Sequence, residues 1–474
     1  MSEQNPAVDD LLKRAQGYHE QIGDFNDALV EGLYEDAARI ADHVVAQGTH
    51  ARKTFDETLD RILTSRTWGF PIMIALLGLV LWVTITGANV PSGLLADLLL
   101  GVVYTWLHQL FAAISAPWWI TGFLVDGVYM ATAWVISVML PPMAIFFPLF
   151  TLLEDFGYLP RVAFNLDRVF AKAGAHGKQA LTMTMGFGCN AAGVIATRVI
   201  DSPRERLIAI ITNNFSLCNG RWPTQILIAT IFIGALVPPA LSGTASMLAV
   251  LGVAVLGVTL SFGVSWGLSK TLLKGEASSF YLELPPYRPP RILQTLYTSV
   301  IDRTLIVLWR AVVMAAPAGA ILWTLSNITV GDANIAAHVV NALDPIGWFI
   351  GLNGVILLAY VLAIPANEIV IPTVLMLTLM VGGTAAGQPG VMVEFDTARQ
   401  TAEVLVGIGG WTLLTGINLM LFSLMHNPCS TTILTIYQET KSLKWTVVAT
   451  VLPILMGIAT TTAITWIARA LRLV

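Results

Sequence analysis

Apolar residues run in long uncharged stretches through most of this chain. Five such stretches contain no Asp, Glu, Lys or Arg: 67–96, 127–153, 222–269, 404–438 and 445–468. Each is long enough for at least one helix of about 20 residues across a bilayer. Two shorter runs, 311–331 and 345–361, and several interrupted segments bring the expected number of spans to about eight. The pattern predicts an all-α, polytopic integral membrane protein.

Residues 1–66 have a different pattern. Apolar positions such as Leu29, Leu33 and Ile40 recur at helical spacing between acidic residues, which predicts a cytoplasmic helical region ahead of the first span. This head holds 13 acidic and seven basic residues, and its negative charge argues against nucleic-acid binding. The first apolar run begins near Phe70 after charged sequence, so we expect no cleavable signal and a location in the cytoplasmic (inner) membrane.

A proline-rich segment divides the membrane region in two. Residues 284–290 (Leu-Pro-Pro-Tyr-Arg-Pro-Pro) lie between two sets of apolar segments, and each set is interrupted by Gly, Pro or Asn. This arrangement is typical of transporters built from two halves with broken helices. The expected parts are a head over 1–66, a first membrane half over 67–275, a proline-rich cytoplasmic connector over 276–302 and a second membrane half over 303–474.

Composition agrees with a membrane protein, since 55% of the residues are hydrophobic and only 12% are charged. The three cysteines occupy one kind of position, a short polar break within an apolar stretch. Cys189 follows Gly-Phe-Gly, Cys218 precedes Asn-Gly, and Cys429 follows Asn-Pro. A thiol beside freed backbone at membrane depth offers the sulfur and oxygen ligands that a transition-metal ion in transit needs. The cysteines therefore mark a candidate metal path.

Oxygen ligands for the same ion are expected from Asn190, Asn427 and Glu368. Glu368 interrupts an apolar segment, and a carboxylate within a span is by default a functional hypothesis. Two other roles are open for it, capping a half-helix or pairing with a buried arginine such as Arg310. His426 is expected to be a hydrogen-bonding histidine rather than a ligand.

Several segments together resemble the bacterial ferrous iron transport protein B family. Residues 152–161, 186–190, 196–198 and 203–206 resemble its first Gate region. Residues 283–288 match its segment between the halves, and 367–370 with Pro428 and Cys429 resemble its second Gate. The likeness runs from about residue 55 to the carboxyl end. It departs at Ala191-Ala192, where the family has Val-Pro, and at Asn219-Gly220, where the family has Gly-Ala.

The resemblance implies two Gate-type halves that import Fe²⁺ across the cytoplasmic membrane along a path lined by cysteines. Fe²⁺ would be the transported ion, no cofactor would be bound permanently, and the chain would not be an enzyme. No Gly-x-x-x-x-Gly-Lys-Ser/Thr loop or Asn-Lys-x-Asp motif is present, so the family's GTP-binding domain is missing. Expected partners are the lipid bilayer, a separate small GTPase and a small iron-transport accessory protein.

Two other functions remain open at this stage. One is a metal or solute sensor, or an assembly scaffold, built on a Gate fold that does not transport. The other is a permease for a nucleoside-like solute, which would need aromatic and hydrogen-bonding residues and not the cysteines. Oligomeric state and the choice between Fe²⁺, Mn²⁺, Co²⁺ and Zn²⁺ are not readable from ligand type.

Overall fold

The computed structural model describes residues 25–44, 55–65, 67–172, 177–274, 287, 291–331, 333–382, 392–393, 395 and 397–472. These residues are helical except for connecting loops and one small hairpin, so the all-α prediction is confirmed. The hairpin pairs β1 (Thr329–Val330) antiparallel with β2 (Ala333–Asn334), and Thr329 lies opposite Asn334.

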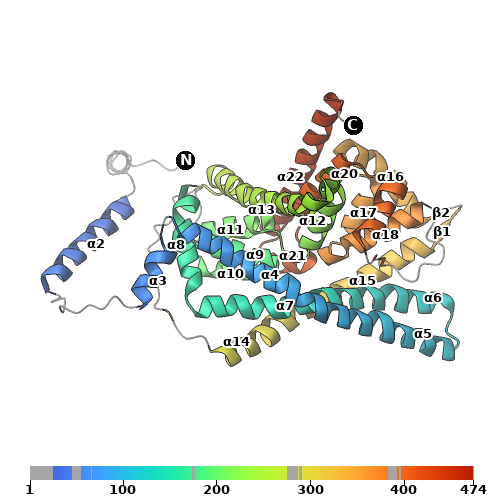
Figure 1. Cartoon of the computed structure of the whole chain (residues 1–474), viewed down its shortest axis with the longest axis horizontal. Coiled ribbons are helices and arrows are strands. Elements are labelled where there is room, and N and C mark those ends of the chain that lie inside the picture. The colour runs from blue at the N-terminus through green and yellow to red at the C-terminus, as the bar shows by residue number, and fades with distance from the viewer. Residues whose placement is uncertain are drawn as a thin grey trace, which may run out of the picture.

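Three long helical rods form one side of the molecule (Figure 1). The first spans Gly69–Ala113, the second Trp118–Asp155 and the third Ile292–Asn327. The first two are antiparallel neighbours, because only residues 114–117 separate them. Their elements are α4 (Gly69–Ala96), η1 (Asp97–Val103), α5 (Tyr104–Ala113), α6 (Trp118–Thr121), η2 (Gly122–Tyr129), α7 (Met130–Asp155), α14 (Ile292–Thr298), η7 (Ser299–Leu305) and α15 (Ile306–Asn327).

The segments between α7 and α14 are short and frequently broken until one long helix closes the set. They are α8 (Tyr158–Lys172), α9 (Gln179–Gly188), α10 (Asn190–Ala196), η3 (Thr197–Val199), α11 (Pro203–Thr212), η4 (Asn213–Phe215), α12 (Trp222–Ile228), η5 (Ala229–Ile233), η6 (Gly234–Leu236) and α13 (Pro239–Lys270). Ser202 caps α11, because its side chain accepts a hydrogen bond from the Glu205 amide.

The segments after α15 are likewise short and frequently broken until one long helix ends the set. They are α16 (Ile335–Ile350), α17 (Gly354–Leu362), η8 (Asn367–Ile369), α18 (Val370–Val381), α19 (Ala398–Ala402), η9 (Glu403–Ile408), α20 (Leu413–Met425), α21 (Ser430–Thr440) and α22 (Leu443–Ala470). Gly351 ends α16 in the left-handed conformation, and the Asn353 side chain caps α17. The chain therefore bends by 107° between α16 and α17.

The expected eight spans are not confirmed. The described residues contain five helices long and apolar enough to cross a membrane, or seven if each of two bent pairs is one span. An uncharged stretch does not reveal where a helix folds back. Residues 404–438, for example, hold part of η9, all of α20 and most of α21, with a bend of 112° before α20. The multi-pass character of the protein is clear, and the count of eight spans stays a prediction.

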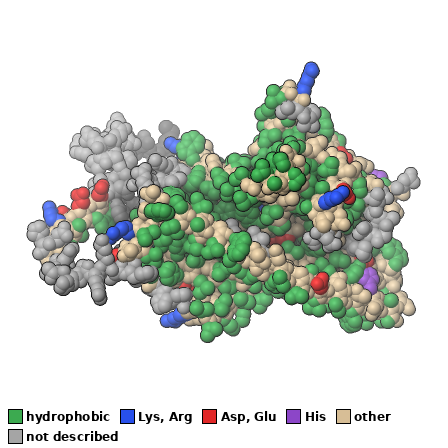
Figure 2. Space-filling model, in the orientation of Figure 1, with side chains coloured by type: hydrophobic (Ala, Val, Ile, Leu, Met, Phe, Trp, Pro, Cys, Tyr) green, Lys and Arg blue, Asp and Glu red, His purple; other side chains and the backbone are tan. Residues whose placement is uncertain are grey.

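The outer surface is apolar over the helix bundle. Figure 2 shows hydrophobic side chains across most of this face, whereas charged groups lie mainly at its edges and near α2 (Phe25–Val44). Trp82, Leu248 and Trp309 are each more than half exposed. Contiguous exposed apolar surface of this extent suits contact with lipid tails.

A polar joint fixes α3 (Phe55–Leu63) to the membrane region. The Asp60 carboxylate accepts hydrogen bonds from Arg161 Nε at 2.9 Å and from the Tyr287 hydroxyl at 2.6 Å. The Arg161 guanidinium also lies 4.1 Å from the centre of the Tyr287 ring. Tyr287 is the one described residue of the predicted 284–290 cluster; its other residues, and 276–286 of the expected connector, lie outside the described part.

Candidate metal-binding cavity

Four helix breaks meet near the middle of the bundle. In the first half, Cys189 separates α9 from α10 and residues 216–221 follow η4; in the second, 363–366 precede η8 and 426–429 separate α20 from α21. One backbone hydrogen bond joins the two breaks of each half, Asn219 N to Gly188 O at 3.1 Å and Ser430 N to Ile364 O at 2.8 Å. Irregular backbone at membrane depth is tolerated where it is buried in protein or lines a cavity.

The two halves present matching backbone at their first breaks. Cys189 has φ −151° and ψ 122°, and Ala366 has φ −151° and ψ 121°. Each is followed by an asparagine, Asn190 or Asn367. Ala366 therefore occupies the position in the second half that Cys189 occupies in the first. Three of the four breaks contribute a cysteine, and the fourth contributes the methyl group of Ala366. The cavity therefore has three thiols.

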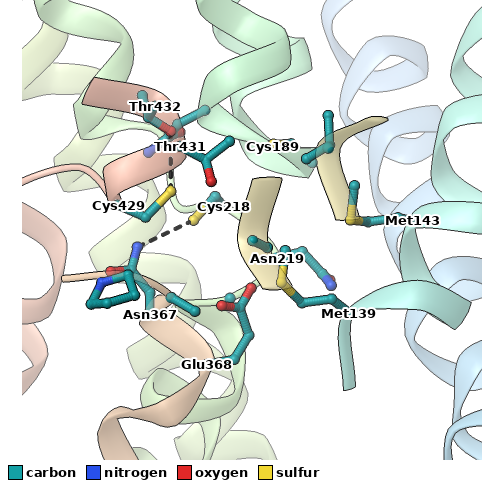
Figure 3. Close-up of a pocket in the computed structure, with 17 residues that line it drawn as sticks. Met139, Met143, Cys189, Cys218, Asn219, Asn367, Glu368, Cys429, Thr431 and Thr432 are labelled. Carbon is teal, nitrogen blue, oxygen red and sulfur yellow. Dashed lines mark hydrogen bonds between the residues drawn. The ribbon is translucent and has the colours of Figure 1, made fainter. Parts of the chain in front are cut away.

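A cavity of about 40 Å³ lies where the breaks meet (Figure 3). This volume holds a partly hydrated ion, because one water needs roughly 10–15 Å³ by the same measure. Cys189, Cys218, Cys429, Asn190 and Glu368 all line it. Asn427 does not, because its amide instead donates to the Pro428 carbonyl at 3.1 Å. Five of the six residues expected from the sequence are thus brought together.

The thiols are spread along the cavity and do not form a closed cage. Cys429 Sγ lies 3.3 Å from the Thr432 hydroxyl, and Cys218 Sγ lies 3.9 Å from the Asn367 amide. Among the described residues, no three His, Cys, Asp or Glu side chains are close enough together to hold a metal ion between them. An ion here would have an incomplete ligand shell, which suits passage better than storage.

Glu368 approaches Gly220 from the opposite half. Its carboxylate points into the cavity in Figure 3, and a Cβ at position 220 would overlap the carboxylate oxygens. In the described part of the chain Glu368 forms no salt bridge, with Arg310 or any other cation. Gly220 is thus needed for close approach rather than for an unusual φ angle.

Arg221 is the buried charge beside this site, and the sequence reasoning did not assign it a role there. Only 1% of the residue is exposed. Its guanidinium donates to the carbonyls of Asn214 at 2.8 Å and Leu424 at 3.1 Å, and to those of His426 at 3.3 Å and Asn427 at 3.2 Å. Three of these carbonyls lie at the carboxyl end of α20, the negative end of its dipole. The sequence signal that could have revealed Arg221 as a site residue was a positive charge next to a long apolar segment.

The remaining polar residues brace the breaks. The Asn190 amide fits its surroundings when its nitrogen donates to Gly186 O at 3.0 Å and Ser216 O at 3.2 Å. His426 Nδ1 lies 2.9 Å from Ser423 O, and its Nε2 lies 3.1 Å from Asn367 Oδ1. The prediction that His426 is a hydrogen-bonding residue is confirmed.

Six further lining residues with polar or sulfur-containing side chains were missed as site residues: Met139, Met143, Asn219, Asn367, Thr431 and Thr432. The methionines lie four positions apart on α7, so their side chains share one face. Pro141 and Pro142 between them were the only local signal. Asn367 bonds to Cys218 across 149 residues of sequence, a distance that no local pattern reveals.

Comparison with known proteins agrees with this two-part arrangement. A family model named Gate and described as nucleoside recognition matches residues 136–263 and 308–443. The chain belongs to the Gate family. A second model, ferrous iron transport protein B C terminus, matches residues 250–302. The resemblance to the membrane portion of that transporter is thereby confirmed, and the Gate match covers all of the cavity's cysteines.

Individual relatives of this Gate protein are named as Fe(2+) transporters. It is 28% identical to "Fe(2+) transporter FeoB" of Staphylococcus aureus over 87% of this chain and 59% of the relative. The protein of that name from Synechocystis is 28% identical over 90% of this chain and 66% of the relative. A "Fe(2+) transport protein A/Fe(2+) transporter FeoB fusion protein" of Porphyromonas gingivalis is 32% identical over 50% of this chain and 26% of its own. The chain spans about three fifths of the length of the first of these relatives, and no solved structure matches it.

Proposed function

We propose that this Gate protein carries a divalent transition metal, foremost Fe²⁺, inward across the cytoplasmic membrane through the cavity of Cys189, Cys218 and Cys429. The supporting observation is that three thiols from three separate helix breaks line one small cavity together with Glu368. Thiolate sulfur and carboxylate oxygen together suit a borderline-soft ion such as Fe²⁺. The names of the relatives point to the same ion.

The incomplete shell is central to the proposal. A transported ion must bind strongly enough to lose part of its hydration and weakly enough to leave. A tetrahedral shell of four thiolates is typical of permanent structural sites. Three dispersed thiols, one carboxylate and neighbouring amides offer the ion successive partial shells instead. We propose that the two membrane halves, 67–275 and 303–474, supply these ligands from their paired breaks.

The cavity does not suit a nucleoside-like solute. About 40 Å³ is far below the roughly 300 Å³ or more of pockets that hold small organic molecules. None of the described residues that line it is aromatic, so no ring is available for a base to stack on. Transport of a bare or partly hydrated ion accounts better for the site than the permease alternative does.

We further propose that the protein works with separate partners. The joint that ties α3 to Arg161 and Tyr287 offers a mechanical route by which a GTPase bound near the amino-terminal head acts on the membrane helices. A small accessory protein is suggested by the relative whose name joins transport protein A to FeoB. Purified protein that takes up Fe²⁺ rapidly in liposomes without nucleotide would contradict the GTPase part of this proposal.

Uptake by proteoliposomes under reducing conditions tests the transport itself. We expect Fe²⁺ uptake by the wild-type chain and a loss of about tenfold or more in each of Cys189→Ser, Cys218→Ser and Cys429→Ser, because each change removes a soft ligand.

Met183→Leu is the matched control, since Met183 is a buried sulfur-containing residue outside the cavity lining. It should transport normally. Wild-type rates in all three serine variants would overturn the cysteine path. An absence of metal uptake by correctly folded wild-type protein, with the partners supplied, would overturn the transport function and favour the sensor alternative.

A further inference from the structure

The His426 ring lies between a backbone carbonyl and a side-chain amide. Its Nδ1 is 2.9 Å from Ser423 O, and its Nε2 is 3.1 Å from Asn367 Oδ1. Both partner atoms, as drawn, are acceptors. The ring can satisfy both only by carrying a proton on each nitrogen, and therefore a positive charge.

A charged His426 is unfavourable at this position. The residue is only 2% exposed, and its own carbonyl accepts a hydrogen bond from the Arg221 guanidinium at 3.3 Å. A second cation would lie beside the first where water is excluded, and no described carboxylate forms a salt bridge with either. The backbone carbonyl of Ser423 can only accept, so Nδ1 carries the single ring proton and Nε2 must accept.

The Asn367 amide must then present its nitrogen to His426. Oxygen and nitrogen of a side-chain amide are assigned from hydrogen bonding, so exchanging the two atoms keeps the same positions. Nδ2 donates to His426 Nε2, and Oδ1 takes the position 3.9 Å from Cys218 Sγ. In this orientation the Cys218 thiol can donate weakly to this oxygen.

A sulfur and an oxygen at this separation match one shared metal ion. Ligands at about 2.3 Å for sulfur and about 2.1 Å for oxygen lie roughly 3.6 Å apart at a tetrahedral angle and roughly 3.8 Å apart at 120°. The observed 3.9 Å needs only a small adjustment. Both residues line the cavity, and Figure 3 shows the Asn367 amide directed at the sulfur.

We propose that Asn367 Oδ1, aimed by the neutral His426 ring, and Cys218 Sγ bind the divalent ion together, with His426 as a positioning residue that does not touch it. The proposal rests on the function given above and adds a specific mixed sulfur–oxygen pair. On binding, Cys218 releases its thiol proton to water and the ion replaces the S–H···O contact. Asn190, at the equivalent place in the first half, has its amide nitrogen engaged with two backbone carbonyls.

Cobalt binding to the purified, full-length chain tests this pair, with affinity and the thiolate-to-cobalt charge-transfer absorption as readouts. Asn367→Leu should weaken Co²⁺ binding by about tenfold or more and change the absorption band. Asn327→Leu is the matched control, because among the described residues that amide bonds only to the Trp323 carbonyl, and it lies outside the cavity lining. It should bind Co²⁺ like the wild type.

A double-mutant cycle distinguishes a role of His426 in orienting the Asn367 amide from a general role in holding the fold. Glutamine at 426 can donate or accept, so His426→Gln should weaken Co²⁺ binding by about tenfold, as loss of an outer-shell partner does. In the Asn367→Asp background both terminal atoms are oxygen and either orientation presents a ligand. There His426→Gln should change the affinity by less than about twofold, a coupling that only an aiming role produces.

The outcomes are distinct. Equal weakening by His426→Gln in both backgrounds would overturn the aiming role. Unchanged Co²⁺ affinity and absorption in Asn367→Leu, in a chain that still imports Fe²⁺, would overturn the Asn367–Cys218 pair and leave the proposed transport intact. A wild-type chain that neither binds Co²⁺ nor imports Fe²⁺ would overturn the transport proposal and this pair with it.

Discussion

At the scale of single residues, the site depends on the missing side chain of Gly220 as much as on the side chains that line the cavity. Gly220 has no side chain, and the space is filled by the Glu368 carboxylate. The sequence showed the glycine in a polar break and the carboxylate in an apolar segment. It could not show that they meet, because 148 positions separate them and no local spacing encodes the contact.

Gly220→Ala should displace the Glu368 carboxylate, because the new Cβ would overlap both of its oxygens. We expect Fe²⁺ uptake to fall by about tenfold while the protein still folds. Gly252→Ala on α13 is the control, since a Cβ there meets no atom within 4 Å. Proteoliposome uptake distinguishes the two variants, and equal rates would show that the position of Glu368 is unimportant.

The same scale shows where residue-type reasoning succeeds. The three cysteines in polar breaks do line one cavity, one of the two settings in which irregular backbone is tolerated at membrane depth, and their role in a metal path stays a prediction. Asn427 was grouped with them by proximity to Cys429, yet its amide bonds to the neighbouring carbonyl. Which way a side chain points at an irregular break depends on local φ and ψ angles, and these are not encoded in residue type.

At the scale of elements, the two halves use the same break with different side chains. Ala366 has the backbone angles of Cys189 and also lines the cavity. Polar interruptions in each half predicted that the helices break. The correspondence between Cys189 and Ala366 was not predicted, because an alanine gives no chemical signal and the residues before the two positions differ.

Ala366→Cys should convert the incomplete shell into one with four thiols. We expect Co²⁺ to bind at least about tenfold more tightly and Fe²⁺ uptake to slow, because a fuller thiolate shell resists release. Ala363→Cys is the control, being equally buried but outside the cavity lining. Binding isotherms and uptake rates measure both effects. Faster uptake with unchanged affinity would contradict the argument.

The α3 joint gives a second prediction for an element. The hydrogen-bonded Arg161 guanidinium holds the pKa of Asp60 below its usual value of 3.8. A lowered carboxylate pKa means that the stabilisation is complete above that usual value and is lost only as the pH falls through the lowered one. At neutral pH, Asp60→Asn should therefore cost about 1 kcal/mol, discounted because the side chain is 30% exposed.

Limited trypsin cleavage at Arg61 measures this loosening of α3. Asp60→Asn should speed cleavage by about fivefold, because opening scales with the lost free energy. Asp36→Asn is the control, since the Asp36–Arg39 pair lies exposed on α2 and contributes little. Unchanged cleavage in Asp60→Asn would show that apolar packing alone retains α3.

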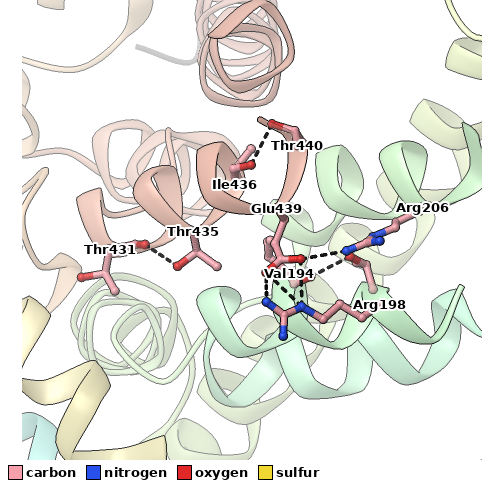
Figure 4. A network of polar contacts seen from close by, with 9 residues as sticks. Val194, Arg198, Arg206, Thr431, Thr435, Ile436, Glu439 and Thr440 are labelled. Carbon is pink, nitrogen blue, oxygen red and sulfur yellow. Dashed lines mark hydrogen bonds and ion pairs between the residues drawn. The ribbon is translucent and has the colours of Figure 1, made fainter. Parts of the chain in front are cut away.

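At the scale of the whole molecule, one carboxylate joins the two halves at the end of α21 (Figure 4). Glu439 accepts from Arg198 Nη2 at 2.6 Å and from Arg206 Nη2 at 2.8 Å, and only 6% of its side chain is exposed. Both arginines belong to the first half and Glu439 to the second. The sequence places these arginines in segments that resemble the first Gate region, but their partner lies more than 230 positions away.

Glu439→Gln should loosen this contact and change the rate at which the halves separate. We expect Fe²⁺ uptake to rise by about fivefold, because loss of 1 kcal/mol from a closed state shifts its population by that factor. Glu403→Gln is the control, since the Arg399–Glu403 pair is exposed within one helical segment. Liposome flux is the measurement, and a fall in flux with reduced thermal stability would assign the cluster a purely structural role.

The overall architecture was more predictable than its span count. Long uncharged runs sufficed for an all-α membrane protein, because hydrocarbon demands internally bonded helices. Whether an apolar run crosses the bilayer once or bends back depends on single residues such as Gly351, whose left-handed conformation ends α16. A hydropathy average over a segment hides such single residues, so it cannot show how many times the chain crosses the bilayer.

The buried Arg221 guanidinium would limit how many ions the proposed conduit can hold. Its charge acts on Cys218, Cys429 and Glu368, and four backbone carbonyls hold it in place. With Arg221, the Glu368 carboxylate and one thiolate, the fixed charge is −1, so one divalent cation leaves the site at +1 and a second would face net repulsion in a medium of low dielectric constant. If the cavity carries the ion as proposed, this repulsion disfavours conduction by mutual displacement of queued cations. Flux should saturate along a simple hyperbola as external metal rises, with one cation per cycle.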